Sequence, residues 1–393
     1  MKRIVILDPG LITVVSHNYS EANALQREAR ALQLSTRILC HRDAHRAVLA
    51  IPAEPFFRLH SYGHLADLRP ATDFMAINFS NQTILKDLTL LTETVTSNDF
   101  VFFPTVNCNI VLAISQWMKH LAPADAPSFG LCLMFPPDTN TAFQPSAVAA
   151  DTYRKALAEI PRSLADRIVY TCKIDALSKA YADLLGTQPV TLPIPTWASD
   201  AQEPRPPAPN EMRISFLGGA RQEKGFGLLP DVISIVRKRY PAARFTVQAV
   251  GFSKALIASV VERLAAHRDV VKLIDQSLSD QALRAAMAAT SLLLMPYDAE
   301  KYRQRGSSLF TEARRMGIPM VLPAGTAIGE EGLRDGIAAT FEAFNADSVA
   351  DAVMRAIDQR ERLSEAARQR AGSERVRSQH YLAILLRRLG TLG

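Results

Sequence analysis

Residues 216–227 read Phe-Leu-Gly-Gly-Ala-Arg-Gln-Glu-Lys-Gly-Phe-Gly, and this stretch decides how the second half of the chain is interpreted. It ends an apolar run over Arg213–Leu217 and precedes a helical pattern over Gly227–Arg239. Glycines let the backbone approach a ligand closely, and the free N–H groups of a helix N-terminus attract anions. Arg221 and Lys224 add two positive charges to the same turn. The pattern favours a diphosphate-binding turn, although an ordinary strand–helix connection with two solvated basic residues is compatible with this motif alone.

A second turn with glycine and serine lies further along the chain, where residues 302–312 read Tyr-Arg-Gln-Arg-Gly-Ser-Ser-Leu-Phe-Thr-Glu. A helix is expected to begin near Ser308, so that Gly306, Ser307 and Ser308 present N–H groups and hydroxyls to phosphate oxygens. Glu312 would lie one turn into that helix, where its carboxylate can accept hydrogen bonds from a ribose diol. A carboxylate at this place also simply favours the helix.

Short apolar runs alternate with amphipathic helical patterns throughout, which is typical of parallel sheets built from βαβ units. The expected strands are Arg3–Leu7, Thr36–Cys40, Asp99–Phe103, Ser128–Met134, Arg167–Thr171, Arg213–Leu217, Arg244–Val250, Val270–Leu273, Ser291–Met295 and Met320–Leu322. The expected helices include Ser20–Ala31, Asn109–His120, Ala147–Leu157, Gly227–Arg239, Lys254–Ala266, Asp280–Met287 and Leu309–Met316. The region 42–72 is less regular. We interpret its Phe56-Phe57 and His60–His64 stretches as an irregular surface loop, with an acceptor wall or a membrane-facing patch as the alternative.

A proline-rich segment divides the chain. Its prolines are Pro204, Pro206, Pro207 and Pro209. Such a segment can form neither a helix interior nor a central strand, so we interpret 198–211 as an interdomain linker. We therefore expect an α/β fold of two doubly wound Rossmann-like domains, over 1–197 and 212–372, facing each other across a cleft. The last segment, 373–393, contains a basic amphipathic helix over Ser373–Leu389 that could return to pack on the N-terminal domain.

Length and charge fit this organisation. The chain has 393 residues, of which 48% are hydrophobic and 21% charged, with a net charge of +6. That length suits two domains of roughly 150–200 residues. The mild positive charge is compatible with nucleotide diphosphates or with peripheral contact to phospholipid headgroups. Nucleic acid ranks last as a partner because the sequence has no zinc finger, RNP motif or basic helix–turn–helix.

The cysteines and the lengths of the apolar runs bear on the cellular compartment in which the protein is expected. Cys40, Cys108, Cys132 and Cys172 lie far apart in apolar surroundings, and no pair has Cys-x-x-Cys spacing. No export signal or transmembrane stretch is evident. We therefore expect a cytoplasmic protein with reduced, buried thiols.

The two turns, in this order, give residues 212–331 a resemblance to the nucleotide-sugar domain of GT-B glycosyltransferases, especially the large family-4 group of retaining enzymes. That group has a Gly-Arg-x-x-x-x-Lys-Gly stretch after the first strand of its second domain, and Gly218 through Gly225 occupy it. It also has a Glu-x7-Glu motif, a Gly-x-Pro turn and a Gly-Gly-x-x-Glu loop. The residues that match these are Glu312, Gly317, Pro319 and Glu330.

The resemblance implies transfer of a sugar from a UDP- or GDP-sugar to a glycan, lipid-linked or protein acceptor, with retention, in polysaccharide biosynthesis. It implies that Lys224 and Arg221 act on the diphosphate and that Glu312 binds the ribose. The implied donor-binding set is Gly218, Gly219, Gln304, Arg305, Gly306, Ser307, Ser308 and Glu312. No cofactor is expected besides the donor, and no metal, because no Asp-x-Asp motif is present.

The match is divergent. The family's arginine falls on Gly219, and Arg221 stands two places later. The first glutamate of the acidic motif falls on Gln304, which can donate and accept hydrogen bonds but carries no charge. The two glycines of the last loop fall on Thr326 and Ala327.

The first half resembles GT-B acceptor domains loosely. His17 fits a histidine of the first strand–loop–helix, although no glycine precedes it, and a cap or surface residue is the plainer interpretation. The family's other histidine is absent after Phe135-Pro136-Pro137, where Asp138 is a candidate acid/base group. Three alternatives remain open: a catalytically degenerate nucleotide- or sugar-binding subunit, a GT-B-type UDP-sugar epimerase, and a two-lobed solute receptor. The absence of an export signal argues against the receptor.

Overall fold

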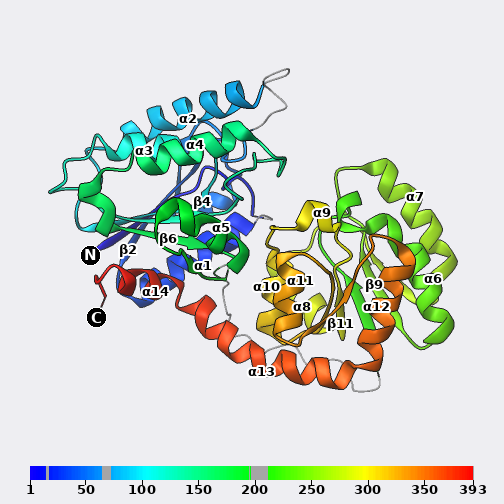
Figure 1. The fold of residues 1–393 in the computed structure, drawn as a ribbon. Coiled ribbons are helices and arrows are strands. Elements are labelled where there is room, and N and C mark those ends of the chain that lie inside the picture. Colours follow the sequence, from blue (N-terminus) through cyan, green and yellow to red (C-terminus); the bar gives the residue numbers. More distant parts are fainter. Residues whose placement is uncertain (15–16, 64–71, 194, 196–210, 393) are drawn as a thin grey trace. The chain divides into compact units, whose positions relative to one another are not determined.

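The computed structural model describes residues 1–14, 17–63, 72–193, 195 and 211–392 (Figure 1). The chain divides into two compact units: unit 1 is Met1–Trp197 with Arg377–Gly393, and unit 2 is Ala198–Val376. The linker predicted over 198–211 lies, apart from Glu211, outside the described residues.

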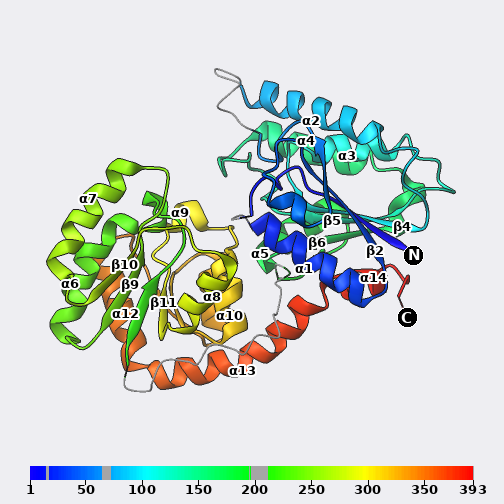
Figure 2. The same ribbon diagram turned by 180° about the vertical axis from the view of Figure 1, so that it is seen from behind.

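Unit 1 contains a seven-stranded parallel sheet in the order β3-β2-β1-β4-β5-β6-β7. Its strands are β1 (Arg3–Leu7), β2 (Ser35–His41), β3 (Ala53–Phe57), β4 (Asp99–Val106), β5 (Ser128–Leu133), β6 (Ile168–Cys172) and β7 (Val190–Thr191). Its helices are α1 (His17–Ala31), α2 (Asp73–Thr89), α3 (Val111–Met118), α4 (Ala147–Ala158), α5 (Asp175–Leu185) and α14 (Tyr381–Arg388). Helices α2, α3 and α4 cover one face of the sheet, and α1 and α14 cover the other (Figures 1 and 2).

Unit 2 contains a six-stranded parallel sheet in the order β10-β9-β8-β11-β12-β13. Its strands are β8 (Arg213–Phe216), β9 (Arg244–Gln248), β10 (Val271–Ile274), β11 (Leu292–Leu294), β12 (Met320–Pro323) and β13 (Ala338–Phe341). Its helices are α6 (Leu229–Arg239), α7 (Lys254–Leu264), α8 (Asp280–Ala288), α9 (Ala299–Tyr302), α10 (Ser308–Met316), α11 (Ala327–Arg334) and α12 (Ala346–Asp358). Helices α6, α7 and α12 lie on one face, and α8, α10 and α11 on the other (Figures 1 and 2).

The central strands are hydrophobic because parallel sheets are covered on both faces. Every residue of β4 is buried, and its Phe103 packs edge-on against Trp117 of α3. Gly130 lies in β5 where a Cβ would come within 2.5 Å of the Phe100 ring, so close packing across the sheet requires glycine there. The apolar runs seen in the sequence are therefore the buried central strands of each sheet.

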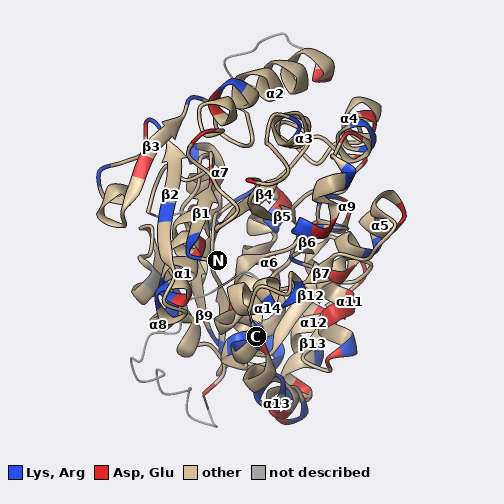
Figure 3. Cartoon of the chain, turned by 90° about the vertical axis from the view of Figure 1, so that its left-hand side faces the viewer, with Lys and Arg blue, Asp and Glu red and all other residues tan. Residues whose placement is uncertain are grey.

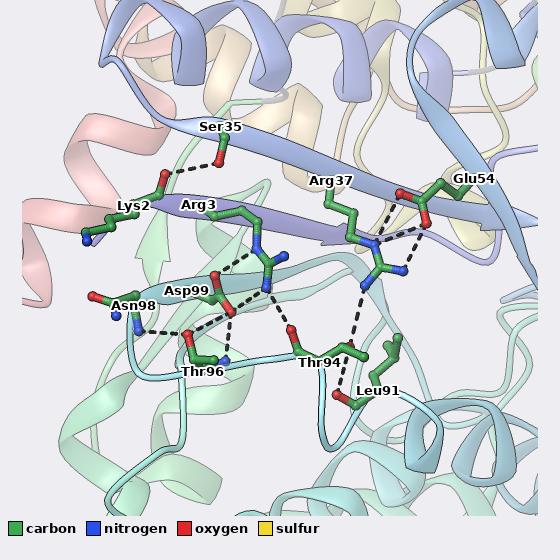
Figure 4. Close-up of polar contacts among 10 residues, drawn as sticks. All are labelled: Lys2, Arg3, Ser35, Arg37, Glu54, Leu91, Thr94, Thr96, Asn98 and Asp99. Atoms are coloured by element: carbon green, nitrogen blue, oxygen red, sulfur yellow. Dashed lines mark hydrogen bonds and ion pairs between the residues drawn. The ribbon is translucent and has the colours of Figure 1, made fainter.

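Ion pairs fix the amino-terminal edge of the unit 1 sheet. The Arg3 guanidinium at the start of β1 donates to both oxygens of Asp99, which begins β4, at 2.9 and 2.8 Å (Figure 4). Arg37 of β2 donates to Glu54 of β3 in the same way. Elsewhere, positive and negative side chains are interspersed along the helices (Figure 3).

The prediction of an α/β fold with two doubly wound sheets is confirmed, and one local expectation is wrong. Residues 53–57 form edge strand β3 rather than a loop, and Phe57 is fully buried. Pro55 obscured this strand in the sequence, because proline lacks an N–H and is tolerated only at sheet edges.

The helix predicted over Ser373–Leu389 is two helices. Helix α13 (Arg360–Gln379) begins in unit 2 and ends in unit 1, and α14 follows a break at His380. Tyr381, Leu382 and Leu385 of α14 join the buried core of unit 1. No described helix is both long enough and apolar enough to cross a bilayer, and all four cysteines are buried and unpaired.

In each sheet the strand order reverses beside the first strand, between β1 and β4 in unit 1 and between β8 and β11 in unit 2. Ligands of open α/β sheets bind at the carboxyl ends of the strands at such reversals. The loops after β1, β4, β8 and β11 are therefore the places to look for a site.

Candidate functional site

In the loop after β8, two glycines have the left-handed backbone conformation that glycine readily adopts. Gly218 has a φ of +94° and donates its N–H to Oε1 of Gln248 at 2.7 Å. A short 3-10 turn over Gln222–Lys224 ends at Gly225, whose φ is +71°. The predicted helix over Gly227–Arg239 begins two residues late, at Leu229, because a second 3-10 turn precedes it.

Contacts to the segment after β11 bring the two predicted motifs together. A Cβ on Gly225 would lie 2.1 Å from the carbonyl oxygen of Pro296, so the two backbones touch. The Asp298 N–H donates to the Glu223 carbonyl at 2.9 Å. Two segments distant in sequence thus form one surface at the strand-order reversal.

Positive charge is concentrated on this surface. The Lys224 ammonium lies 5.4 Å from the centre of the Tyr297 ring, and the Arg305 guanidinium lies 4.8 Å from that of Tyr302. The two tyrosine rings are themselves 4.4 Å apart. Arg221 donates to the Tyr302 hydroxyl at 3.3 Å, so all three cations are arranged around one aromatic pair.

Lys224 has no counter-ion in the described part of the chain: no carboxylate there lies within ion-pair distance of its ammonium. Burial, followed by the charges of Arg221 and Arg305, lowers the pKa of Lys224 to about 8, while Glu223 opposes the shift. Glu223 itself pairs with Arg221 at 3.2 Å. A cation held in this way favours an anionic ligand.

Helix α10 begins against the same loop. Ser307 is its N-cap residue, and no side-chain hydrogen bond caps the helix. A Cβ on Gly218 would lie 3.0 Å from Leu309 in its first turn. Gly306 and Ser308 are exposed beside Ser307, so the start of this helix faces solvent with N–H groups available to an anion.

Glu312 is in the second turn of α10, and an arginine holds it. Arg315 donates to Oε2 of Glu312 through Nε at 3.0 Å and Nη2 at 2.9 Å. Both side chains are largely buried. Oε1 of Glu312 takes no part in these contacts. Gln304 is half-buried in the preceding loop, and Glu330 is exposed near the start of α11.

The two candidates in unit 1 have different surroundings. His17 is the first residue of α1, and its Nε2 is buried without a hydrogen-bond partner among the described residues. Burial, with the charge of Lys173, lowers the pKa of His17 to about 3, so the imidazole is neutral at physiological pH. Asp138 is exposed in the loop after β5. The described residues contain no group of three or more His, Cys, Asp or Glu placed to hold a metal.

Several residues of the surface were not predicted from the sequence. The rings of Tyr297 and Tyr302 contact Lys224 and Arg305. Gln248 accepts the hydrogen bond of the Gly218 N–H, and Arg315 orients the Glu312 carboxylate. Two signals could have indicated them: the tyrosines flank the second motif, and an arginine three residues after a helical glutamate can pair with it.

Solved structures share this fold along the whole chain. One is HepE from Anabaena in complex with UDP and glucose, with a TM-score of 0.60, 13% identity, and coverage of 98% of this chain and 99% of that chain. A second is the trehalose-6-phosphate structure from E. coli bound with UDP-2-fluoro glucose, with a TM-score of 0.66 and 12% identity over 100% of both chains. A third is a glycosyltransferase from Rickettsia africae, with a TM-score of 0.64, 10% identity, and coverage of 99% and 98%.

These similarities show the fold. No family model and no curated protein matches the sequence. These structural neighbours share the GT-B fold, so the chain has the GT-B fold, as its two motifs predicted. Its sequence is divergent within that fold.

Proposed function

We propose that this chain is a glycosyltransferase that uses a nucleoside diphosphate sugar, held by unit 2. The observation that carries the proposal is the Lys224 ammonium, which lacks a counter-ion in the described residues and lies with Arg221 and Arg305 at the strand-order reversal. Two neighbours of the same fold were solved with UDP and glucose and with UDP-2-fluoro glucose. UDP is therefore the first donor nucleotide to test, and GDP the second.

The proposed chemistry follows from charge. Breaking the bond between sugar and phosphate places negative charge on the departing diphosphate, and positioned cations stabilise that charge in the transition state. Lys224 and Arg221 would act on the diphosphate, with Gly218 and Gly219 allowing close approach. Protein cations would replace a metal ion in this role. Transfer would proceed with retention, as the family resemblance implies.

The remaining candidate residues have proposed roles around the same ligand. Gly306, Ser307 and Ser308 would hold phosphate oxygens at the start of α10. Glu312, oriented by Arg315, would bind the ribose, Gln304 would contact the sugar, and Arg305 would contact the phosphates. Unit 1 would bind the glycan, lipid-linked or protein acceptor, with His17 and Asp138 as its candidate groups. A cytoplasmic location with peripheral contact to an anionic membrane belongs to the same proposal.

A single substitution tests the role of Lys224. Lys224→Ala should lower turnover about a hundredfold, the usual effect of losing one donor to a developing oxyanion, while the protein still folds. Lys238→Ala, at an exposed position of α6, is the matched control and should be neutral. Near-wild-type turnover in Lys224→Ala would show that the site is assigned wrongly. Activity that is lost in EDTA and restored by Mg²⁺ would contradict metal independence.

A second candidate function is that of a catalytically degenerate subunit which binds nucleotide and sugar. Gln304 favours it, because an uncharged side chain stands where the family has a glutamate. UDP or GDP binding in a calorimeter, with neither transfer nor hydrolysis of the corresponding sugars, would identify such a subunit.

A further inference from the structure

Lys224 has surroundings that bear on its chemical reactivity as well as on its charge. Its ammonium lies 5.4 Å from the centre of the Tyr297 ring, and no carboxylate of the described residues pairs with it. Its neighbour Glu223 pairs instead with Arg221, at 3.2 Å. Burial raises the pKa of both Tyr297 and Tyr302, so the two rings are uncharged at neutral pH. The Lys224 side chain is half-buried, so a small reagent in solution can reach it.

These surroundings favour the neutral form of the Lys224 amine. Burial withdraws the ammonium from water, and the guanidinium groups of Arg221 and Arg305 repel a further positive charge, while Glu223 opposes both effects. The pKa of Lys224 is thereby lowered to about 8. About half of the amine is then neutral at pH 8, compared with about one part in 250 for an ordinary lysine. The neutral amine is a nucleophile, whereas the ammonium is not.

Groups that attract phosphate lie beside this amine. Arg221 donates to the Tyr302 hydroxyl at 3.3 Å, and the Arg305 guanidinium lies 4.8 Å from the centre of the same ring. A Cβ on Gly218 would lie 3.5 Å from Nζ of Lys224 and 3.0 Å from the leucine in the first turn of α10. The amine and the start of that helix therefore border the same glycine. A phosphate held by the two arginines is placed within reach of the nucleophile.

We propose that Lys224 is a covalent modification site, which small acyl phosphates such as acetyl phosphate acylate. The neutral amine attacks the acyl carbonyl carbon, so that an N–C bond forms and the C–O bond to the phosphate breaks. Inorganic phosphate leaves with the bonding electron pair, and the nitrogen releases one proton to water. The product is an uncharged amide, so this surface of unit 2 loses a cation. That the loss weakens donor binding rests on the proposed function; the acylation itself rests on the geometry around Lys224.

Mass spectrometry of the full chain after incubation with acetyl phosphate tests the site. At pH 8, Lys224 should be acetylated at least tenfold faster than Lys238, which is an exposed lysine of α6. With N-acetoxysuccinimide, an uncharged acetyl donor, this preference should shrink at least threefold, because no phosphate guides the reagent. Excess inorganic phosphate should slow acetylation of Lys224 by acetyl phosphate and leave Lys238 unaffected. The rate at Lys224 should level off above about pH 9, where the amine is almost fully neutral.

Calorimetry with UDP tests the consequence of the modification. Acetylation of the wild-type chain should weaken UDP binding at least tenfold, because a charged donor of hydrogen bonds is lost. Lys224→Arg keeps the positive charge but does not react, so its affinity for UDP should be the same before and after treatment. Thermal unfolding of the acetylated chain shows that it remains folded. A loss of affinity in treated Lys224→Arg as large as that in the wild type would assign the effect to another lysine and overturn the inference.

The labelling rates separate this inference from the proposed function. Equal acetylation of Lys224 and Lys238, or the same preference with both reagents, would overturn the inference. UDP binding by a chain that shows no selective acetylation would leave the proposed function intact. Selective acetylation of Lys224 in a chain that binds neither UDP nor GDP would support the modification site and contradict the proposed function alone.

Discussion

Lys224 is the residue on which the account of unit 2 depends. Its pKa of about 8, against an ordinary 10.5, means that holding it charged in the unliganded protein costs about 3 kcal/mol. A protein keeps such a group where a ligand relieves the cost. The diphosphate of the proposed donor would do so.

This cost predicts opposite effects of pH on stability and on binding. Between pH 8 and 10.5 the unfolded chain holds a proton that folded Lys224 has released, so the free energy of unfolding should rise with pH. Over the same range the affinity for UDP should fall, by up to about tenfold per pH unit, because the cation is lost. Urea denaturation and calorimetry measure the two trends. Lys224→Met should flatten both, and an unchanged pH dependence in that variant would assign the effect to another group.

A second prediction at the scale of single residues concerns a substitution of Gly225. Its φ is +71°, and a Cβ on it would lie 2.1 Å from the Pro296 carbonyl oxygen, so Gly225→Ala should destabilise unit 2 by about 2 kcal/mol. It should also displace Lys224 and weaken UDP binding at least tenfold. Gly227→Ala is the control, because a Cβ there meets only the flexible Gln222 side chain at 3.2 Å. Equal behaviour of the two variants in thermal unfolding would refute this reading of the loop.

At this scale the sequence predicted the residues that carry charge and missed those that position them. The glycines, Arg221 and Lys224 stood out because their chemistry is visible in a short motif. Tyr302 and Arg315 did not, since their roles depend on contacts that only the folded chain makes. Asp138 was selected for its place in the sequence, and the structure leaves it exposed.

Among the elements, α14 is held in unit 1 by a cap from another helix. The Glu28 carboxylate of α1 accepts hydrogen bonds from the N–H groups of Leu382 and Ala383 at 2.8 and 2.9 Å. Glu28→Ala should cost about 1–2 kcal/mol and speed amide hydrogen exchange throughout α14. Glu93→Ala, at an exposed site of unit 1, should do neither. Unchanged exchange in Glu28→Ala would mean that apolar packing alone holds this helix.

A buried charge network joins α10, α11 and α13. Arg314 pairs with Glu331 at 3.0 Å, Asp335 at 2.8 Å and Glu374 at 3.5 Å, and all four side chains are at most 9% exposed. Arg314→Met would remove the cation that these three buried carboxylates share, while Arg370 would still lie 3.2 Å from Asp335, so unfolding should become easier by about 3 kcal/mol. The control Arg334→Met removes an exposed partner of Asp335 and should cost well under 1 kcal/mol. Similar denaturation midpoints for both variants would contradict the network's role.

The helices and strands show which elements a sequence pattern can predict and which it cannot. Buried strands such as β1 were predicted at their true bounds because a run of aliphatic residues has few other uses in a soluble fold. Strand β3 was missed because Pro55 argues against a strand until its place at the sheet edge is known. The break at His380 was missed because no glycine or proline marks it and basic residues lie on both sides of it.

For the whole molecule, alternation of strands and helices was enough to predict two doubly wound sheets, because right-handed βαβ crossovers leave few other arrangements. The sequence pattern did not predict the strand order in each sheet, and so it could not place the strand-order reversals where ligands bind. That order followed from which strands pair in the folded units. The GT-B fold does not by itself assign a function, and the proposed donor and acceptor depend on the side chains of each site.

Calorimetric titration of UDP into the wild-type chain and into Lys224→Met tests the central claim most directly. The account predicts that the wild-type protein binds UDP with a Kd tighter than about 1 mM and that the folded variant binds at least tenfold more weakly. The unliganded variant should also be more resistant to denaturant than the wild type, because a costly buried charge is gone. Equal affinity in both proteins, or no binding of UDP or GDP by the wild type, would contradict the claim that this surface of unit 2 holds a nucleoside diphosphate.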